Sequence, residues 1–217
     1  MMCFSYNFLF VPELIGWVNH FLSKPENFNK FYFENKTSNN EKTSSFVPKE
    51  LRPGVNDIVN PELMRLSLPR LEYFHLFVWP PYSGGYYEGH IQDIHIDIYP
   101  FLLEKQKKIA YNIPIVGADN NCYLEWYNDA KKVYSTPESE TKTKTGNKLV
   151  LEWEQGPEMI EEVPHIKPRF ITINKPHRIR SGKNIFVVAS LRFERNHSLK
   201  EYYEYLILKG KKETHGS

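Results

Sequence analysis

Residues 90–99 read HIQDIHIDIY, and this stretch decides the fold that the sequence predicts. Isoleucine occupies every second position from 94 to 98, and the positions between carry Asp93, His95, Asp97 and Tyr99. A period of two is that of a β-strand, in which residues i and i+2 project from the same face. One face of this strand is therefore apolar, and the other presents the imidazole of His95 beside the carboxylate of Asp97.

Further stretches of the chain also have the character of strands, because they are rich in β-branched and aromatic residues and are bounded by polar turns. They are residues 71–79, 109–116, 122–127, 148–153, 169–174 and 185–193. Aromatic residues make up 15% of the chain, which favours sheets over a helical bundle. Many short strands with few helices predict a mainly β fold, a sandwich or a barrel.

The N-terminal part of the chain differs from the rest. Residues 13–22 place apolar side chains at helical spacing after Pro12, which predicts a short amphipathic helix. Residues 35–49 are polar without an apolar period and predict a loop. Pro53, Gly54 and Pro61 extend this irregular character. We therefore divide the chain into an N-terminal helix and loop extension over 1–65, a β domain over 66–200 and a C-terminal tail over 201–217, with a mobile excursion at 135–147.

Composition limits the function classes. The 217 residues suit one domain, and 28 Lys and Arg against 26 Asp and Glu give no electrostatic case for nucleic acid or an acidic membrane. Cys3 and Cys122 are too few for a disulfide framework, which favours a reducing compartment. The apolar opening segment contains Pro12 and Glu13 and is too short to span a bilayer. We expect a cytoplasmic protein without a membrane anchor.

His95 and Asp97 are candidate metal ligands. Two imidazoles and one carboxylate form the facial triad of non-haem Fe(II) oxygenases, which leaves coordination positions open for substrate and oxygen. The second imidazole that we nominate is His177, in the segment NKPHRI. His90 is a rival, because a site of His90, His95 and His177 would be cupin-like. Its offset of five from His95 places it on the opposite strand face unless a bulge intervenes.

A succession of short motifs resembles bacterial and phage members of the 2-oxoglutarate and Fe(II)-dependent oxygenase superfamily over about residues 71–193. In chain order the motifs are HID (95–97), YNIPI (111–115), LEWY (124–127), KPRF (167–170) and SLRF (190–193). The resemblance implies a double-stranded β-helix, the jelly-roll or cupin-like barrel. It also implies Fe(II) held by His95, Asp97 and His177, and a 2-oxoglutarate cosubstrate that chelates the iron.

The sequence departs from this family at the cosubstrate arginine, whose usual place is taken by Phe186, Val187 and Val188. Arg192 is the substitute that we nominate, because it shares a strand face with Ser190. An equal alternative is that Arg192 forms a structural salt bridge at the rim of the barrel. Asn112 and Tyr111 are further candidates for cosubstrate contact, on opposite faces of their strand.

The predicted function is an Fe(II)- and 2-oxoglutarate-dependent oxygenase of the hydroxylase type, with no catalytic residue beyond the metal ligands. Its small-molecule or peptide substrate is not fixed by the fold. Two alternatives remain at this point. One is a non-catalytic jelly-roll binding or structural protein, and the other is a cupin-type metal enzyme that does not use 2-oxoglutarate.

Overall fold

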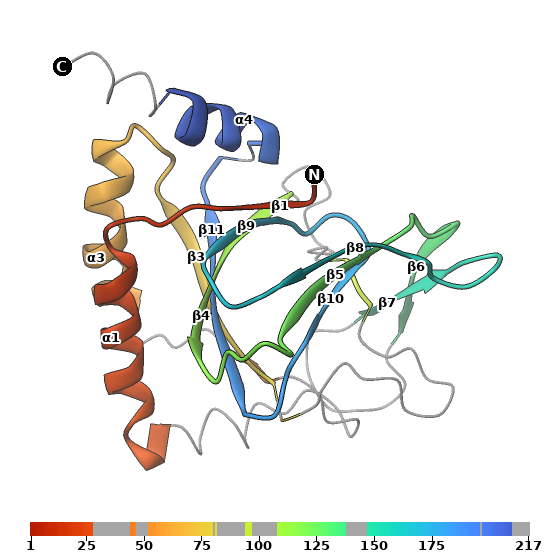
Figure 1. Cartoon of the computed structure of the whole chain (residues 1–217), viewed down its shortest axis with the longest axis horizontal. Coiled ribbons are helices and arrows are strands. Elements are labelled where there is room, and N and C mark those ends of the chain that lie inside the picture. Colours follow the sequence, from red (N-terminus) through yellow and green to blue (C-terminus); the bar gives the residue numbers. More distant parts are fainter. Residues whose placement is uncertain are drawn as a thin grey trace.

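The chain folds around two antiparallel β-sheets that face each other, with helices on the outer side of the larger sheet (Figure 1). The computed structural model describes residues 1–27, 44–46, 52–79, 81, 94–96, 108–137, 147–195 and 197–209. The prediction of a mainly β fold is confirmed. Every helix in this described part of the chain is too short or too polar to cross a membrane.

The larger sheet has the strand order β1-β9-β4-β11-β3-β2, and every neighbouring pair is antiparallel. Its strands are β1 (Cys3–Ser5), β2 (Ser44–Phe46), β3 (Leu71–Trp79), β4 (Ile109–Val116), β9 (Arg169–Thr172) and β11 (Phe186–Phe193). The predicted strands 71–79 and 109–116 coincide with β3 and β4, and those at 169–174 and 185–193 contain β9 and β11.

The smaller sheet has the order β10-β5-β8, and a separate hairpin of β6 and β7 projects beside it (Figure 1). These strands are β5 (Tyr123–Tyr127), β6 (Lys132–Pro137), β7 (Asn147–Glu152), β8 (Met159–Pro164) and β10 (His177–Arg180). β5 and β7 were predicted to within a residue. β6 extends into the segment that we expected to be a mobile excursion, and we did not predict β8.

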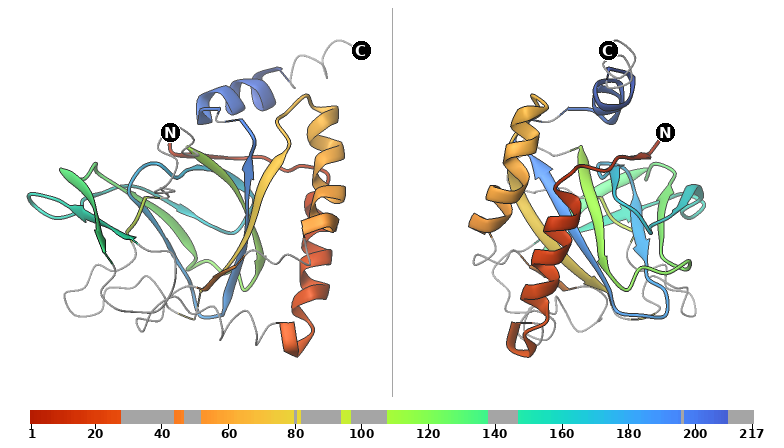
Figure 2. Two further views of the ribbon diagram at one scale, coloured as in Figure 1. Left: turned by 180° about the vertical axis from the view of Figure 1, so that it is seen from behind. Right: turned by 60° about the vertical axis from the view of Figure 1, so that its left-hand side comes forward.

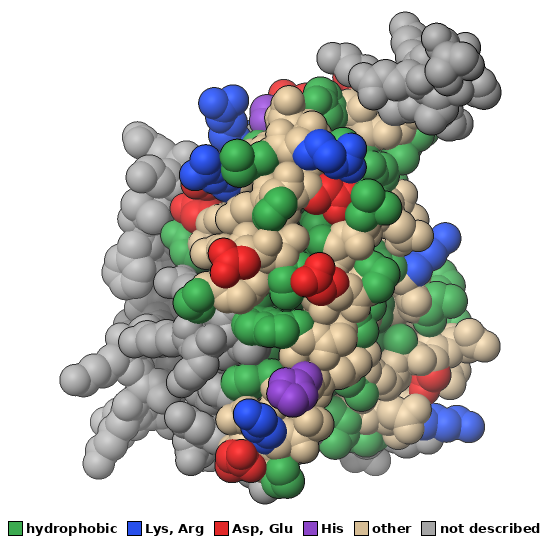
Figure 3. Space-filling model, turned by 90° about the vertical axis from the view of Figure 1, so that its left-hand side faces the viewer, with side chains coloured by type: hydrophobic (Ala, Val, Ile, Leu, Met, Phe, Trp, Pro, Cys, Tyr) green, Lys and Arg blue, Asp and Glu red, His purple; other side chains and the backbone are tan. Residues whose placement is uncertain are grey.

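Two helices cover the outer face of the larger sheet (Figure 2). α1 (Val11–Leu22) confirms the predicted N-terminal helix, with proline in its first turn and Leu14 and Val18 buried. Figure 3 looks onto this helical side, where hydrophobic and charged side chains alternate over the surface without a large patch of either kind. The helices therefore seal one face of the sheet and leave its other face to the smaller sheet.

The second helix, α3 (Arg52–Arg65), corrects our prediction of an irregular extension. Val55, Val59 and Leu63 follow at intervals of four and have no exposed surface. Burial of this apolar stripe offsets the cost of Pro61 inside the helix, because helices in proteins owe most of their stability to tertiary packing. Intrinsic propensity alone therefore gave the wrong result for this segment.

Segments at both ends of the domain also differ from the sequence prediction. β2 lies within the predicted loop 35–49 and pairs with β3, whereas the rest of that loop is outside the described residues. Residues 201–209, which we assigned to a tail, are helical: 201–203 belong to α4 (Leu199–Tyr203), and the π-helical segment η2 (Glu204–Lys209) continues it. Tyr202 and Leu206 from these helices are buried in the core.

Two hydrophobic clusters meet at β11, which is buried at every position. Its odd-numbered residues, such as Ala189 and Leu191, belong to the cluster under the helices. Phe186 and Val188 belong to the cluster between the two sheets. Because side chains alternate along a strand, Ser190 and Arg192 also face the smaller sheet. We call this side of the larger sheet the inner face.

Gly54 permits the close contact of α3 with α1, and we expect Gly54→Ala to destabilise the protein. A β-carbon at this position would lie 2.2 Å from Cζ2 of Trp17, so the Trp17 ring must move. Overpacking of this kind costs about 1–3 kcal/mol. Gly16→Ala is the matched control, because nothing lies within 4 Å of its added β-carbon and alanine favours helix by up to ~1 kcal/mol. Denaturant unfolding measures both; equal stability of the two variants would contradict the packing.

Candidate metal and cosubstrate site

His95 and His177 lie directly opposite each other in an isolated antiparallel bridge. The backbone N–H of each donates to the carbonyl of the other at 2.9 Å, and the ring centroids are 4.5 Å apart. Directly opposed residues project from the same face of a sheet. The structure therefore brings together two of the three predicted metal ligands, which are far apart in the sequence.

The hydrogen bond of His177 defines the chemistry of its ring. Nδ1 lies 2.8 Å from the carbonyl oxygen of Lys175, and a carbonyl can only accept. Nδ1 of the neutral ring therefore carries the proton, and Nε2 is the nitrogen with a lone pair. This arrangement is typical of metal-binding histidines, whose second nitrogen donates to a carbonyl or carboxylate. His177 is buried and His95 is exposed.

The third predicted ligand, Asp97, lies outside the described residues, as does the rival ligand His90. Within the described ranges no group of three or more His, Cys, Asp and Glu side chains could hold a metal ion. The predicted strand 90–99 is described only at 94–96, where Ile94 and Ile96 are half-buried. The participation of Asp97 therefore stays a prediction.

Three of the four predicted cosubstrate residues form a hydrogen-bonded chain on the inner face. Nη1 of Arg192 donates to Oγ of Ser190, and Oγ of Ser190 donates to Oδ1 of Asn112. Ser190 stands opposite Asn112 in the pairing of β11 with β4. All three side chains are buried, with at most 4% of their surface exposed. The structure thus joins Asn112 to Ser190 and Arg192, which the sequence placed together on one strand face.

Tyr111 does not belong to this group. It alternates with Asn112 along β4, so its ring lies in the cluster under the helices, against Phe8 and Phe170. Its hydroxyl donates to the carbonyl of Tyr6 at 2.7 Å, and burial raises its pKa well above the ordinary value. Our assignment of Tyr111 as a cosubstrate contact is at odds with this position, because the body of the sheet separates it from the inner face.

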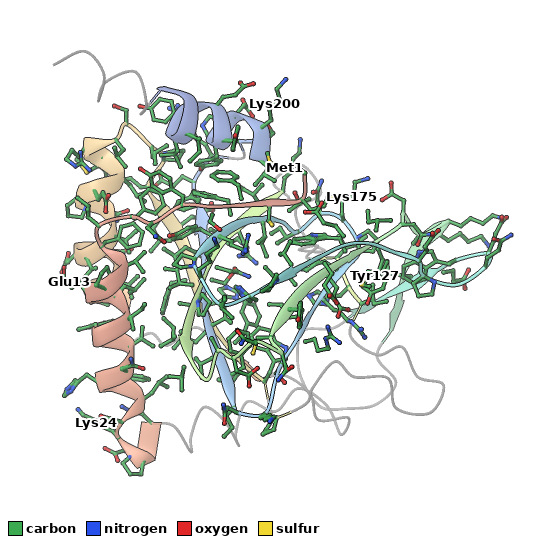
Figure 4. The ribbon with its side chains drawn as sticks, viewed as in Figure 1. Met1, Glu13, Lys24, Tyr127, Lys175 and Lys200 are labelled. Carbon is green, nitrogen blue, oxygen red and sulfur yellow. The ribbon has the colours of Figure 1, made fainter. Side chains whose placement is uncertain are left out.

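The two groups of site residues lie at the same end of the molecule. β10 begins at His177, and after a short turn β11 runs back and ends at Phe193. Ser190 and Arg192 are therefore near the end where β10 starts. In the smaller sheet His177 pairs with Trp126, which itself belongs to the cluster between the sheets. Figure 4 shows Tyr127 and Lys175 on the side of the molecule away from α1, which carries the labelled Glu13.

A buried charged cluster on the other face of the smaller sheet fixes β10 against β5. Glu125 has 1% of its surface exposed and accepts hydrogen bonds from Arg178 Nε and, at 2.6 Å, from the hydroxyl of Tyr127. Nε of Arg180 lies 3.1 Å from the same carboxylate. Since Arg178 follows His177 directly, this cluster holds the backbone that presents the imidazole. The sequence signal was weak: the LEWY motif drew attention to this strand, but nothing marked Glu125 as buried.

His165 is a second feature that sequence reasoning missed. It has no exposed surface and packs edge-on against Phe186. Neither ring nitrogen has a hydrogen-bond partner among the described residues. Burial, with a smaller contribution from the nearby Arg169, lowers its pKa from 6.5 to about 3. The ring is therefore neutral, because charging it would require an uncompensated cation between the sheets.

Comparison with known proteins adds no functional assignment. No family model matches the sequence, and a search of curated proteins finds no significant match. The functional inference therefore rests on the residues themselves and on where the fold places them.

We expect Glu125→Gln to destabilise the protein by about 3–5 kcal/mol, because it leaves the Arg178 guanidinium buried without its carboxylate. Glu162→Gln is the control, since exposed Glu162 also pairs with Arg180, and exposed pairs contribute about 0–1 kcal/mol. Chemical denaturation of both variants measures the difference. Equal losses of unfolding free energy in the two variants would show that burial does not strengthen the ion pairs of Glu125.

His165 should make the protein acid-sensitive. In the unfolded chain the imidazole binds a proton below pH ~6.5, whereas in the folded protein it does so only near pH 3. Stability therefore falls as the pH drops through this window, by on the order of 3 kcal/mol between pH 7 and pH 4. His165→Leu should remove this part of the dependence, and the exposed His20→Leu should retain it. The test is to measure the free energy of unfolding of each variant at several pH values. Parallel pH profiles of wild type and His165→Leu would refute the effect.

Proposed function

We propose that this protein is an Fe(II)- and 2-oxoglutarate-dependent oxygenase with a double-stranded β-helix core. The observation that carries the proposal is the direct pairing of His95 with His177. Two predicted ligands from distant parts of the chain lie opposite each other, and the hydrogen bond from Nδ1 of His177 to the carbonyl of Lys175 puts the lone pair of the neutral ring on Nε2, the nitrogen that would bind a metal.

The path of the chain supports the finer fold assignment. Successive segments alternate between the two sheets. β3 lies in the larger sheet, and the segment at His95 lies beside β10 of the smaller sheet. β4 then lies in the larger sheet and β5 in the smaller sheet. Later, β8, β9, β10 and β11 pass from sheet to sheet in the same way. Jelly-roll and cupin folds are built from two facing sheets of this kind. The excursion of β6 and β7 is inserted between the two halves of this path.

The metal would be held by His95, His177 and Asp97. When bound, Fe(II) with 2-oxoglutarate supplies the activation of oxygen that hydroxylation requires. The residues themselves orient the site: the carbonyl of Lys175 fixes the ring of His177, and the Glu125 cluster fixes the strand behind it. Ile94 and Ile96 flank His95 and are half-buried, which anchors the strand that would carry Asp97.

The cosubstrate would be held by Arg192 with Ser190 and Asn112. A guanidinium in a water-poor site between the sheets binds a carboxylate strongly, because the charge-assisted hydrogen bonds are not weakened by solvent. Ser190 accepts from Arg192 and in turn donates to Asn112, which orients the guanidinium before a ligand arrives. This arrangement supports a binding role for Arg192 in the proposed site.

The experiment has two stages. Elemental analysis of protein loaded anaerobically with Fe(II) should give one iron per chain, and His177→Ala and Asp97→Ala should lose it. Titration with 2-oxoglutarate should then produce a weak visible charge-transfer band in the wild type. Arg192→Ala should still bind iron but lose the band at the same cosubstrate concentration, because the far carboxylate is left without its cation.

Arg195→Ala is the matched control, because this arginine is exposed and lies two residues beyond the end of β11; the variant should bind both ligands as the wild type does. Iron binding without a band at millimolar 2-oxoglutarate would exclude the cosubstrate and favour the cupin-type alternative. Absence of iron binding would favour the non-catalytic jelly-roll.

A further inference from the structure

A row of polar residues crosses the inner face of the larger sheet from one strand to the next. Strand register places Ser5 opposite Arg169, Arg169 opposite Asn112, Asn112 opposite Ser190, and Ser190 opposite His75. The row therefore runs over β1, β9, β4, β11 and β3. The cosubstrate group accounts for Asn112 and Ser190, but it leaves the charged member of the row, Arg169, without a role.

Arg169 has no carboxylate partner in the described part of the chain, since no acidic oxygen there lies within 4.0 Å of its guanidinium. Its hydrogen-bonding contact is Nη1 to the Sγ of Cys3 at 3.7 Å, and its Nε is buried without a partner among the described residues. A thiol sulfur is a weak acceptor. Burial also raises the pKa of Cys3, so this thiol stays neutral and does not balance the charge.

The described neighbours of Arg169 are apolar or neutral, apart from Glu161, whose charge acts on Cys3 and whose Oε2 accepts a hydrogen bond from the backbone N–H of Met2 at 3.2 Å. Ile171 lies two residues along the same strand and belongs to the cluster between the sheets. The charge of Arg169 contributes to the lowered pKa of His165, and the His165 ring is itself neutral. The buried Nε of this guanidinium makes no hydrogen bond with the described residues, and the natural ligand of the planar donor array is a carboxylate or a phosphate. The side chain is only half-buried, so a ligand can reach it.

We propose that Arg169 binds an oxyanion, a carboxylate or phosphate group, and that this group belongs to the primary substrate. The assignment to the substrate rests on the proposed oxygenase function, because Arg192 there holds the cosubstrate. Arg169 and Arg192 stand two strands apart, which separates their backbones by about 10 Å at the usual strand spacing. Arg192 is engaged with Ser190, so we assign Arg169 to a second anionic group, and the substrate class is then an anionic small molecule or an anionic side chain.

The test uses the full-length protein loaded anaerobically with Fe(II) and saturated with 2-oxoglutarate. Inorganic phosphate and acetate are the probes, titrated by calorimetry at constant ionic strength with chloride as the reference salt. We expect at least one oxyanion to bind, and Arg169→Gln to weaken it by about tenfold or more through loss of charge-assisted hydrogen bonds. Phosphate and acetate arms identify which oxyanion the site prefers.

Arg169→Lys keeps the charge but loses the planar donor array, so its affinity should lie between wild type and Arg169→Gln. If Arg169→Gln does not fold, Arg169→Lys still tests whether oxyanion binding depends on the guanidinium. Arg195→Gln, at an exposed site, should bind as the wild type does. No binding of either oxyanion by the wild type, or equal binding by wild type and the folded Arg169 variants, overturns the inference.

The charge-transfer band separates this inference from the proposed function. Arg169 variants should keep the band of bound 2-oxoglutarate, whereas loss of the band in these variants alone would make Arg169 the cosubstrate anchor and overturn its assignment to the substrate. Arg169-dependent oxyanion binding in a protein that gives no band would leave the anion site standing and reject the oxygenase.

Discussion

The antiparallel pairing of His95 with His177 is the constraint on which the candidate site depends. It is a backbone interaction, with two hydrogen bonds of 2.9 Å, and it fixes two imidazoles from distant segments on one face of the smaller sheet. The pairing in turn depends on β10, which is held on its other edge by β5. The buried carboxylate of Glu125 reinforces that edge through Arg178. The metal chemistry that we propose is thus supported by ionic contacts on the opposite face of the same sheet.

The larger sheet contributes the complementary half of the site. β11 is buried on both faces, so its alternation divides the molecule into an apolar layer under the helices and an inner face on which Ser190 and Arg192 follow the apolar Phe186 and Val188. Polar side chains in such a position need partners, and Arg192, Ser190 and Asn112 partner one another. Arg169 departs from this pattern, since its charge has no such partner in the described part of the chain. A cation, a hydroxyl and an amide are thus aligned between the two sheets, where we propose that they hold a small anionic ligand.

The sequence located most strands because alternation along a strand is a local signal. Strands β3 and β4 were predicted to the residue, and parity alone put Ser190 and Arg192 on one face. Local signals failed where tertiary contacts decide. Proline and glycine in 52–65 suggested a loop, yet burial of Val55, Val59 and Leu63 makes it a helix. His165 and Glu125 carried no spacing signal, because their significance lies in their burial.

The sequence by itself determined the mainly β class, the N-terminal helix, and the strand faces that carry His95, Ser190 and Arg192, because each follows from the period of side chains along one segment. Only the tertiary structure decided which segments meet. It shows His177 opposite His95 and Arg169 in register with Asn112, and it places Tyr111 under the helices, on the face of the larger sheet opposite to the inner face. Strand register between distant segments depends on the packing of the whole core, and no single stretch of sequence contains it.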